Sequence, residues 1–345
     1  MQSLTFTRPD DCHLHLRDGA ALASVLPHTA RAFARAVVMP NLKPPVTDTA
    51  LAAAYRGRIL NVLPKGSKFE PLMTLYMTDS TGAEEIARAK RSGFVCGVKY
   101  YPAGATTHSA AGVTRIERAY PALEAMEEIE LPLLVHGEVT TPGVDVFDRE
   151  RVFLETVLAD ITRRFPRLRV VVEHVTTREA VDFVFASGPH VAATITAHHL
   201  LYNRSALFSG GLRPHYYCLP VLKREEHRLA LVRAATSGNP KFFLGTDSAP
   251  HARSDKETLC GHAGIYSAHA AIELYAEVFE QAGALDKLEA FASFYGADFY
   301  RLSRNAGSLT LRKETWTVPG EIPLGAATMV PLRAGETVGW RLAEE

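Results

Sequence analysis

Two histidines one residue apart stand near the start of the chain, in the stretch DCHLHLRD at residues 11–18. Residues two apart in a β-strand point to the same face, so His13 and His15 can both reach one metal ion. Four more candidates end short apolar runs: Lys99 in GVKYYP, His136 in LLVHGE, His174 in VVVEHV and Asp247 in FFLGTDSAPH. Taken singly, each has an ordinary explanation, such as a hydrogen-bonded core histidine or a capping aspartate. Their joint occurrence favours a metal centre, because a buried lysine and carboxylate among imidazoles are costly unless something organises the charges.

Eight short apolar or β-branched runs supply the positions for these residues, and most of the runs precede a segment with helical periodicity. The predicted strands cover residues 10–15, 35–40, 71–77, 95–100, 131–136, 169–174, 191–197 and 241–246. Alternation of this kind predicts parallel βα units, and eight units favour an α/β protein of the closed (β/α)8 TIM barrel type. The carboxyl ends of barrel strands meet at one mouth, where active sites assemble. An open, doubly wound sheet is the alternative architecture.

The rest of the chain is predicted to belong to the same domain. Two further helices are expected at 269–283 and 287–300, followed by short strands between Ser308 and Arg341. No linker rich in Pro, Gly or Ser precedes this tail, so we expect one domain, with a barrel at about residues 5–300 and a small C-terminal appendage at about 300–345. Thr81 and Thr176, each three residues before a glutamate, predict capping boxes at two helix starts.

Composition excludes several classes of protein. The 38 Lys and Arg residues balance the 38 Asp and Glu residues, which argues against nucleic acid or a membrane surface as partner and favours a small molecule. The 4 cysteines are scattered and form no Cys-x-x-Cys, as is typical of reduced thiols. No secretory signal and no apolar stretch of ~20 residues is evident, so we expect a cytoplasmic protein.

The order of the candidate residues resembles that of the amidohydrolase superfamily. Within it, the chain is similar over nearly its whole length to the bacterial, non-fused (class II) dihydroorotases, through DCHLHLRD, MPNLKPP, GVKYYPAGATTHS, VHGE, EHVTT, RPHYYCLPVLKREEH and GTDSAPH. The resemblance implies reversible cyclisation of N-carbamoyl-L-aspartate to (S)-dihydroorotate plus water, a step of de novo pyrimidine biosynthesis. It also suggests a homodimer.

The resemblance implies two zinc ions as well. His13 and His15 would bind the first ion with Asp247, and His136 and His174 the second. Lys99 would bridge both ions as a carboxylated lysine, since an ammonium has no lone pair and cannot ligate. A hydroxide bridging the ions would attack the ring amide, with Asp247 as general acid and base. The ligand set accommodates cobalt, nickel or manganese too, so the identity of the ion stays open.

Substrate binding is expected to depend first on Arg17. It continues the side-chain parity of the two histidines and can hold a carboxylate through two hydrogen bonds. The resemblance adds further contacts to the substrate, from His15, Asn41, His136 and His251, and from the backbone near Leu219 and Ala263.

A loop at residues 101–112 is rich in Gly, Ala and Thr, which favours mobility. The resemblance implies that this loop closes on the substrate and that Thr106 and Thr107 provide the contacting hydroxyls. Whether the loop is ordered without a ligand does not follow from the sequence.

Two other functions compete with this one. A hydrolase of hydantoins or dihydropyrimidines is disfavoured, because a neutral ring would leave the guanidinium of Arg17 desolvated and unpaired. A non-catalytic scaffold is disfavoured by the complete set of six metal positions. The remaining candidate groups are predicted to be packed or solvated: His198, His199, His215, His227, His262 and His269, with Cys12 and Cys96 as small apolar side chains.

Overall fold

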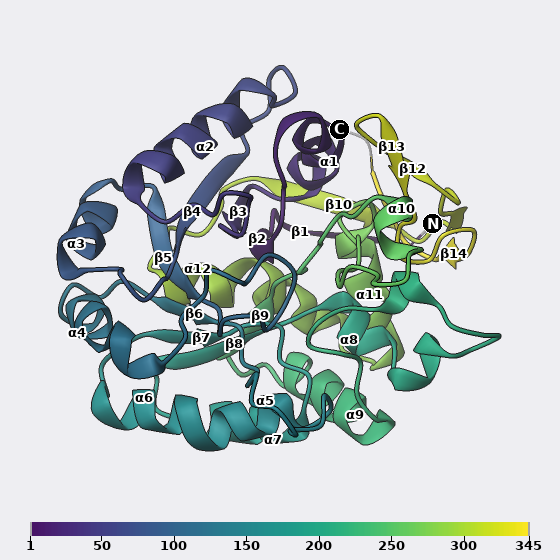
Figure 1. Cartoon of the computed structure of the whole chain (residues 1–345). Helices are drawn as coiled ribbons and strands as arrows, with labels where there is room; N and C mark the ends of the chain where they lie inside the picture. Colours follow the sequence, from purple (N-terminus) through teal and green to yellow (C-terminus); the bar gives the residue numbers. More distant parts are fainter. Residues whose placement is uncertain (1, 344–345) are drawn as a thin grey trace.

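The computed structural model describes residues 2–343, and its centre is a barrel of eight parallel strands paired in chain order (Figure 1). The strands are β2 (Asp10–Leu14), β3 (Arg35–Val38), β4 (Glu70–Tyr76), β5 (Val95–Tyr100), β6 (Leu133–Val135), β7 (Val170–Val172), β8 (Val191–Ile195) and β9 (Phe242–Leu244). The residues after β9 complete the ring against β2: the amide of Asp247 donates to the carbonyl of His13 at 2.8 Å, and the amide of His15 donates to Ser248 at 3.0 Å. The closed barrel is therefore confirmed, and the open sheet was the wrong alternative.

Helices surround the strands on the outside, as Figure 1 shows. They are α1 (Gly19–Ala32), α2 (Thr49–Asn61), α3 (Ala83–Arg91), α4 (Tyr120–Glu128), α5 (Arg149–Phe153), α6 (Ala159–Arg164), α7 (Arg178–Ala186), α8 (Ala197–Leu201), α9 (Glu225–Ala235), α10 (Arg253–Lys256), α11 (Ala271–Gln281) and α12 (Tyr295–Tyr300). A π-helical turn, Leu154–Leu158, joins α5 and α6 into one continuous helical segment. None of the helices in residues 2–343 is long and apolar enough to cross a membrane.

Both predicted capping boxes were wrong by one residue. Helix α7 is capped by Thr177, whose hydroxyl accepts from the amide of Ala180 at 3.1 Å. The hydroxyl of Thr176 instead donates to the carboxylate of Glu150, because a buried carboxylate is stable only when it accepts hydrogen bonds. At α3 the capping position is a glycine, and the hydroxyl of Thr81 accepts from an amide in its own turn.

The interior of the barrel is filled by side chains contributed by most of its strands. This inner cluster contains Cys12, Val37, Met39, Leu72, Leu134, Val171, Ala192, Phe243 and Tyr300, with Cys96 packed against it. Helix α12 packs so closely that a Cβ added to Gly296 would lie 2.4 Å from the sulfur of Cys12. The two cysteines therefore act as the small apolar groups that were predicted.

A bulge in β2 sets the direction of the first histidine. Asp11 pairs with Ala36 and Leu14 with Val38, so three steps along β2 match two along β3. The extra residue interrupts strand alternation, which lets Cys12 and His13 both face the barrel interior. Cys12 packs in the inner cluster, while His13 reaches the mouth.

The C-terminal appendage consists of small antiparallel sheets. β10 (Ser308–Arg312) pairs with β15 (Arg341–Leu342) and also with an unpredicted strand at the start of the chain, β1 (Ser3–Thr7). Two further pairs are β11 (Trp316–Thr317) with β14 (Thr337–Val338), and β12 (Ile322–Leu324) with β13 (Ala327–Met329). Trp340 is fully buried, and its ring nitrogen donates to Glu280 of α11 at 3.1 Å, so the appendage packs on the barrel.

Candidate active site

A pocket opens at the carboxyl ends of the barrel strands, and almost every predicted site residue lines it. The lining comprises His13, His15, Arg17, Asn41, Tyr101, Thr106, Thr107, His136, His174, Leu219, Asp247, Ala249, Ala263 and Gly264. Lys99 and His251 are the two predicted residues outside this set, and both contact it.

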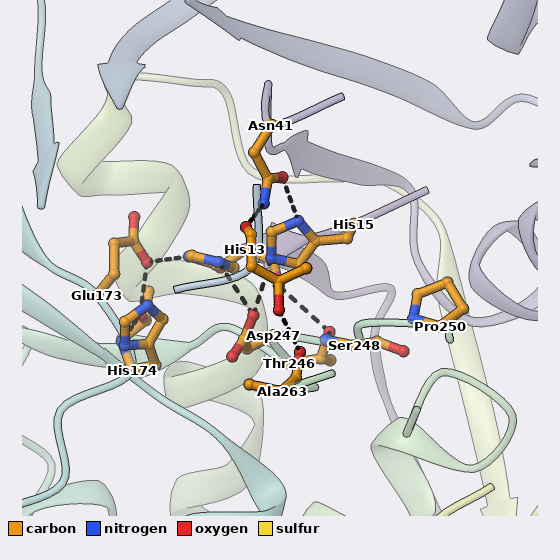
Figure 2. Close-up of polar contacts among 12 residues, drawn as sticks. His13, His15, Asn41, Glu173, His174, Thr246, Asp247, Ser248, Pro250 and Ala263 are labelled. Atoms are coloured by element: carbon orange, nitrogen blue, oxygen red, sulfur yellow. Dashed lines mark hydrogen bonds and ion pairs between the residues drawn. The ribbon is translucent and has the colours of Figure 1, made fainter. Parts of the chain in front are cut away.

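Asp247 lies between the two histidines of the opening motif (Figure 2). One of its carboxylate oxygens is 3.3 Å from Nε2 of His13 and 3.1 Å from Nε2 of His15. Burial opposes ionisation, but hydrogen bonds from the two imidazoles outweigh it and hold the pKa of Asp247 well below its usual value. Ligand atoms of these three residues lie within 4.8 Å of one another, so one metal ion can contact all of them.

A second pair of imidazoles completes a row across the mouth. The ring of His174 is 5.0 Å from that of His13 and 4.9 Å from that of His136. Burial holds the pKa of His174 well below its usual value, so the ring is neutral. Its Nδ1 is buried without a hydrogen-bond partner in the described chain, as expected of a ligand whose metal contributes the missing contact.

Lys99 is fully buried, and its amine also has no hydrogen-bond partner among residues 2–343. The nitrogen lies 5.2 Å from the centre of the Tyr101 ring. Burial lowers the pKa of Lys99 to about 8. A bare ammonium without partners is costly at such a place, whereas a carboxylated amine among metal ions would be satisfied. The residues present therefore fit a metal site at the mouth, beside which the amine of Lys99 lies buried without a partner in the described chain.

Backbone strain marks three site residues. Arg17, His174 and Asp247 have φ values of 59°, 41° and 45°, in the left-handed region that few non-glycine residues adopt. Such conformations are stable only where surrounding contacts enforce them. Each one follows shortly after a barrel strand ends, so the strain turns the side chain toward the cavity.

Glu173 is a functional candidate that the sequence analysis missed. Its carboxylate is 2.7 Å from Nδ1 of His13 and accepts a hydrogen bond from Thr194 at 2.7 Å (Figure 2). A carboxylate on the far nitrogen orients a metal-binding imidazole and raises its basicity. The available signal was a charged residue directly after the apolar run VVV at residues 170–172.

Arg17, His251 and Asn41, the residues of the predicted anion clamp, lie together at one side of the cavity. Its guanidinium donates to Nε2 of His251 at 2.9 Å and to the carbonyl of Pro250 at 2.9 Å. Burial, followed by the charge of Arg17, holds the pKa of His251 far below its usual value, so this imidazole is a neutral acceptor. Asn41 lies beside the clamp, with its side-chain oxygen 2.8 Å from Nδ1 of His15.

The loop of residues 101–112 spans the cavity in this structure. Thr107 donates its hydroxyl to the carbonyl of Ala263 at 3.2 Å, and its own carbonyl accepts from Asn41 at 3.2 Å. The amide of Thr106 donates to Ser109 at 2.8 Å within the loop. The two threonines are thus at the mouth, and their contact with substrate stays a prediction.

The histidines predicted to have no ligand role divide into two groups. His198, His199 and His269 are buried, whereas His215 and His227 pair with surface glutamates. His198, His199 and Cys218 approach one another closely enough for a metal ion. However, both ring nitrogens of His199 already have protein partners, Thr196 at 2.8 Å and the carbonyl of Pro220 at 3.1 Å.

A third possible ligand group joins His251 with Asp255 and His262 at the rim of the cavity. His262 had been predicted to be packed or solvated, and its ring centre lies 5.2 Å from that of His251.

A parallel βα barrel with imidazoles, a lysine and a carboxylate at its mouth defines a class of barrel hydrolases, and comparison with known proteins agrees. Residues 6–319 match the model of the amidohydrolase family. The dihydroorotase of Cupriavidus taiwanensis is 69% identical over 341 residues, 99% of each chain.

Solved structures extend the comparison. The dihydroorotase of Campylobacter jejuni is 36% identical and superposes with a TM-score of 0.91 over 99% of this chain and 98% of that one. The dihydroorotase of Saccharomyces cerevisiae, solved in complex with 5-fluoroorotic acid, is 33% identical with a TM-score of 0.92 over 99% of each chain. The chain belongs to the amidohydrolase family and, within it, to the dihydroorotases, which are cyclic amidohydrolases.

Proposed function

We propose that this chain interconverts N-carbamoyl-L-aspartate and (S)-dihydroorotate with two zinc ions at the barrel mouth, as one step of pyrimidine biosynthesis. The observation that carries the proposal is the convergence of six residues from five strands, with the amine of Lys99 and Nδ1 of His174 both buried and unpartnered. Identity of 69% with a dihydroorotase supports the choice of reaction.

Two groups of residues would hold the metal ions. His13, His15 and Asp247 would hold one ion, His136 and His174 would hold the other, and carboxylated Lys99 would contribute ligand oxygens to both. Carbon dioxide adds to the neutral amine of Lys99, which forms a nitrogen–carbon bond and releases a proton. When bound, the ions supply a Lewis acid and an activated water for attack on the ring amide.

Asp247 is the general base and acid of the proposed mechanism. Its low pKa means that it is ionised at neutral pH and free to accept a proton. In the hydrolytic direction it takes a proton from the attacking water and delivers it to the leaving ring nitrogen. In the synthetic direction it takes a proton from the carbamoyl nitrogen as that nitrogen attacks the side-chain carboxylate carbon. It gives the proton to the carboxylate oxygen that leaves as hydroxide, and a solvent proton completes the released water.

Recognition of the substrate carboxylate is assigned to Arg17, Asn41 and His251. Arg17 is held by Pro250 and His251, so its free donors are oriented before the substrate arrives. The yeast dihydroorotase structure holds 5-fluoroorotic acid, a ring carboxylate, which supports an anionic ligand here. The backbone near Leu219 and Ala263 would contact the ring, and Thr106 and Thr107 would close over it.

The experiment is a spectrophotometric assay of dihydroorotate hydrolysis before and after removal of metal by a chelator. We expect activity in the purified enzyme, loss after chelation, and recovery when zinc is added. Faster turnover of hydantoin than of dihydroorotate would contradict the substrate assignment. Absence of stoichiometric metal in active protein would contradict the metal centre.

Two further expectations accompany the proposal. The active species is a homodimer, which light scattering on the eluting protein measures directly. The modified lysine adds one carboxyl group, so an intact Lys99 ammonium in experimental density would contradict the bridge.

A further inference from the structure

Two loops form one wall of the cavity. One of them, residues 217–220, contributes Leu219, and the other, residues 257–264, contributes Ala263 and Gly264. These are the two places where substrate is expected to meet backbone rather than side chains. The separation of the loops therefore sets the width of the site at the substrate ring.

A single side chain, Lys256, joins these loops. Its amine donates to the carbonyl of Tyr217 at 2.9 Å in the first loop, and to the carbonyls of His262 at 3.1 Å and of Gly264 in the second. The two acceptors of the second loop flank Ala263. Lys256 thus holds Ala263 from both sides and ties it to the loop that carries Leu219.

The surroundings of Lys256 suit a positioning role. The residue is only 5% exposed, and the three hydrogen-bond partners of its amine are all backbone carbonyls. An ammonium can donate three hydrogen bonds at once, which no neutral side chain of similar length can do. Burial lowers the pKa of Lys256 to about 8, because desolvation disfavours the charged form of the amine.

Other contacts depend on the same geometry. The amide of Gly264 donates to the carbonyl of Tyr217 at 3.0 Å, directly between the loops. The loop passes so close to the anion clamp that a Cβ on Gly264 would lie 2.8 Å from the ring of His251. On the other side, the carbonyl of Ala263 accepts from Thr107 of the 101–112 loop.

We propose that Lys256 is a positioning residue for substrate binding, which acts by fixing the loop of Leu219 against the loop of Ala263. The identity of the substrate rests on the proposed function. Lys256 contacts none of the predicted metal ligands, so loosening the wall weakens binding of dihydroorotate but leaves the bond-making step intact.

The test compares Lys256→Met with a matched control, Lys241→Met. Lys241 also donates to three carbonyls, those of Val184, Phe185 and Ser187, but at the carboxyl end of α7, away from the cavity. For Lys256→Met we expect KM for dihydroorotate to rise about tenfold, with kcat within about twofold and metal content unchanged. Lys241→Met loses equivalent bonds and keeps its KM.

Amide hydrogen exchange gives a second readout that needs no substrate. Exchange at Gly264 should accelerate at least about tenfold in Lys256→Met and stay unchanged in Lys241→Met. If the wild-type enzyme did not hydrolyse dihydroorotate, the proposed function would be wrong, while the exchange data would still decide whether Lys256 joins the loops.

Three results would overturn the proposal for Lys256. The first is an unchanged KM with unchanged exchange in folded Lys256→Met. The second is an equal rise in KM in the Lys241→Met control. The third is failure to fold of both Lys256→Met and the milder Lys256→Gln, because the hydrogen bonds would then serve the stability of the whole chain.

Discussion

Asp247 shows how single residues prepare the chemistry of this site. It shares one carboxylate oxygen between two imidazoles, adopts a strained backbone conformation, and follows β9, the last strand of the barrel. Its ionisation is maintained against burial by hydrogen bonds from His13 and His15. A carboxylate held in this way can bind metal and transfer a proton without leaving its place.

Replacement of Asp247 by Asn separates these two tasks. We expect Asp247→Asn to lower kcat by about 100- to 10,000-fold, because an amide cannot accept the proton. Metal analysis should show that most of the zinc remains bound, since five other ligands are intact. Asp298→Asn, which breaks a surface ion pair with Arg304, is the control. Near-normal turnover of Asp247→Asn would contradict its role.

Replacement of Lys99 by Ala removes the proposed bridge. We expect lower metal content and loss of most activity, with partial recovery when a short carboxylic acid is added, because the acid supplies the two missing oxygens. Activity and bound metal are measured on the same sample. Full metal occupancy with full activity would show that Lys99 has no bridging role.

Glu173 can be tested through the metal rather than through turnover. Glu173→Gln retains a hydrogen-bonding group beside His13 but removes the charge. We expect affinity for zinc to fall about 10- to 100-fold, as for other partners of metal-binding histidines, measured by competition with a chelator. An unchanged affinity for zinc would show that Glu173 only packs beside His13 and does not support metal binding.

At the scale of elements, the ends of strands and helices decide which way side chains point. The bulge in β2 directs His13 into the mouth while Cys12 remains in the inner cluster. At α7 the capping group is one residue later than the sequence pattern predicts, because Thr176 is engaged by a buried carboxylate. Alternation and capping rules are local, whereas these two choices depend on neighbouring strands and helices.

The cap of α7 gives a prediction about stability. Thr177→Ala should lower the free energy of unfolding by about 1 kcal/mol, because the amide of Ala180 loses its acceptor. The measurement is urea unfolding of the metal-loaded enzyme. Thr156→Ala, at an exposed position inside the helix of α5 and α6, should change stability by less than about 0.5 kcal/mol. Equal effects of the two changes would contradict the cap.

At the scale of the whole molecule, the barrel gathers residues from the entire chain, and the appendage braces it. The backbone carbonyl of Tyr266 accepts a hydrogen bond from the amide of Leu332 at 2.8 Å, which connects the barrel with the appendage. His269 lies next to this contact, with its ring 5.9 Å from that of Tyr266. This histidine is 5% exposed, so its charge state is coupled to packing.

The pH dependence of stability follows from this burial. Burial lowers the pKa of His269 to about 3, below the value of about 6.5 in the unfolded chain. Below pH 6.5 the unfolded state therefore binds more protons than the folded state does. The stability contributed by the neutral, buried ring is complete above that pH and declines as the pH falls toward 3. We expect the free energy of unfolding to fall less steeply in metal-free His269→Phe than in the metal-free wild type as the pH is lowered from about 6 to 4. The two slopes should differ by up to about 1.4 kcal/mol per pH unit. Identical slopes would contradict the assignment.

Much of the fold was predictable from the sequence, and the physical reasons differ between the strands, the barrel and the residues at the strand ends. Strand positions follow from apolar runs, and the barrel follows from eight strand and helix pairs, because both are encoded in short segments. The polar residues at strand ends had to share one mouth once the barrel closed. Strand β1 was not predicted, since its partner, β10, lies about three hundred residues away.

By itself, then, the sequence determined the barrel, the order of the polar residues that follow its strands, and the family. Only the tertiary structure decided that Glu173 supports His13, that a bulge turns that histidine inward, and that Lys256 joins the two loops of one cavity wall. The physical reason is the range of the interactions. Propensity and alternation act over a few residues, whereas each of these decisions is a contact between segments that only folding brings together.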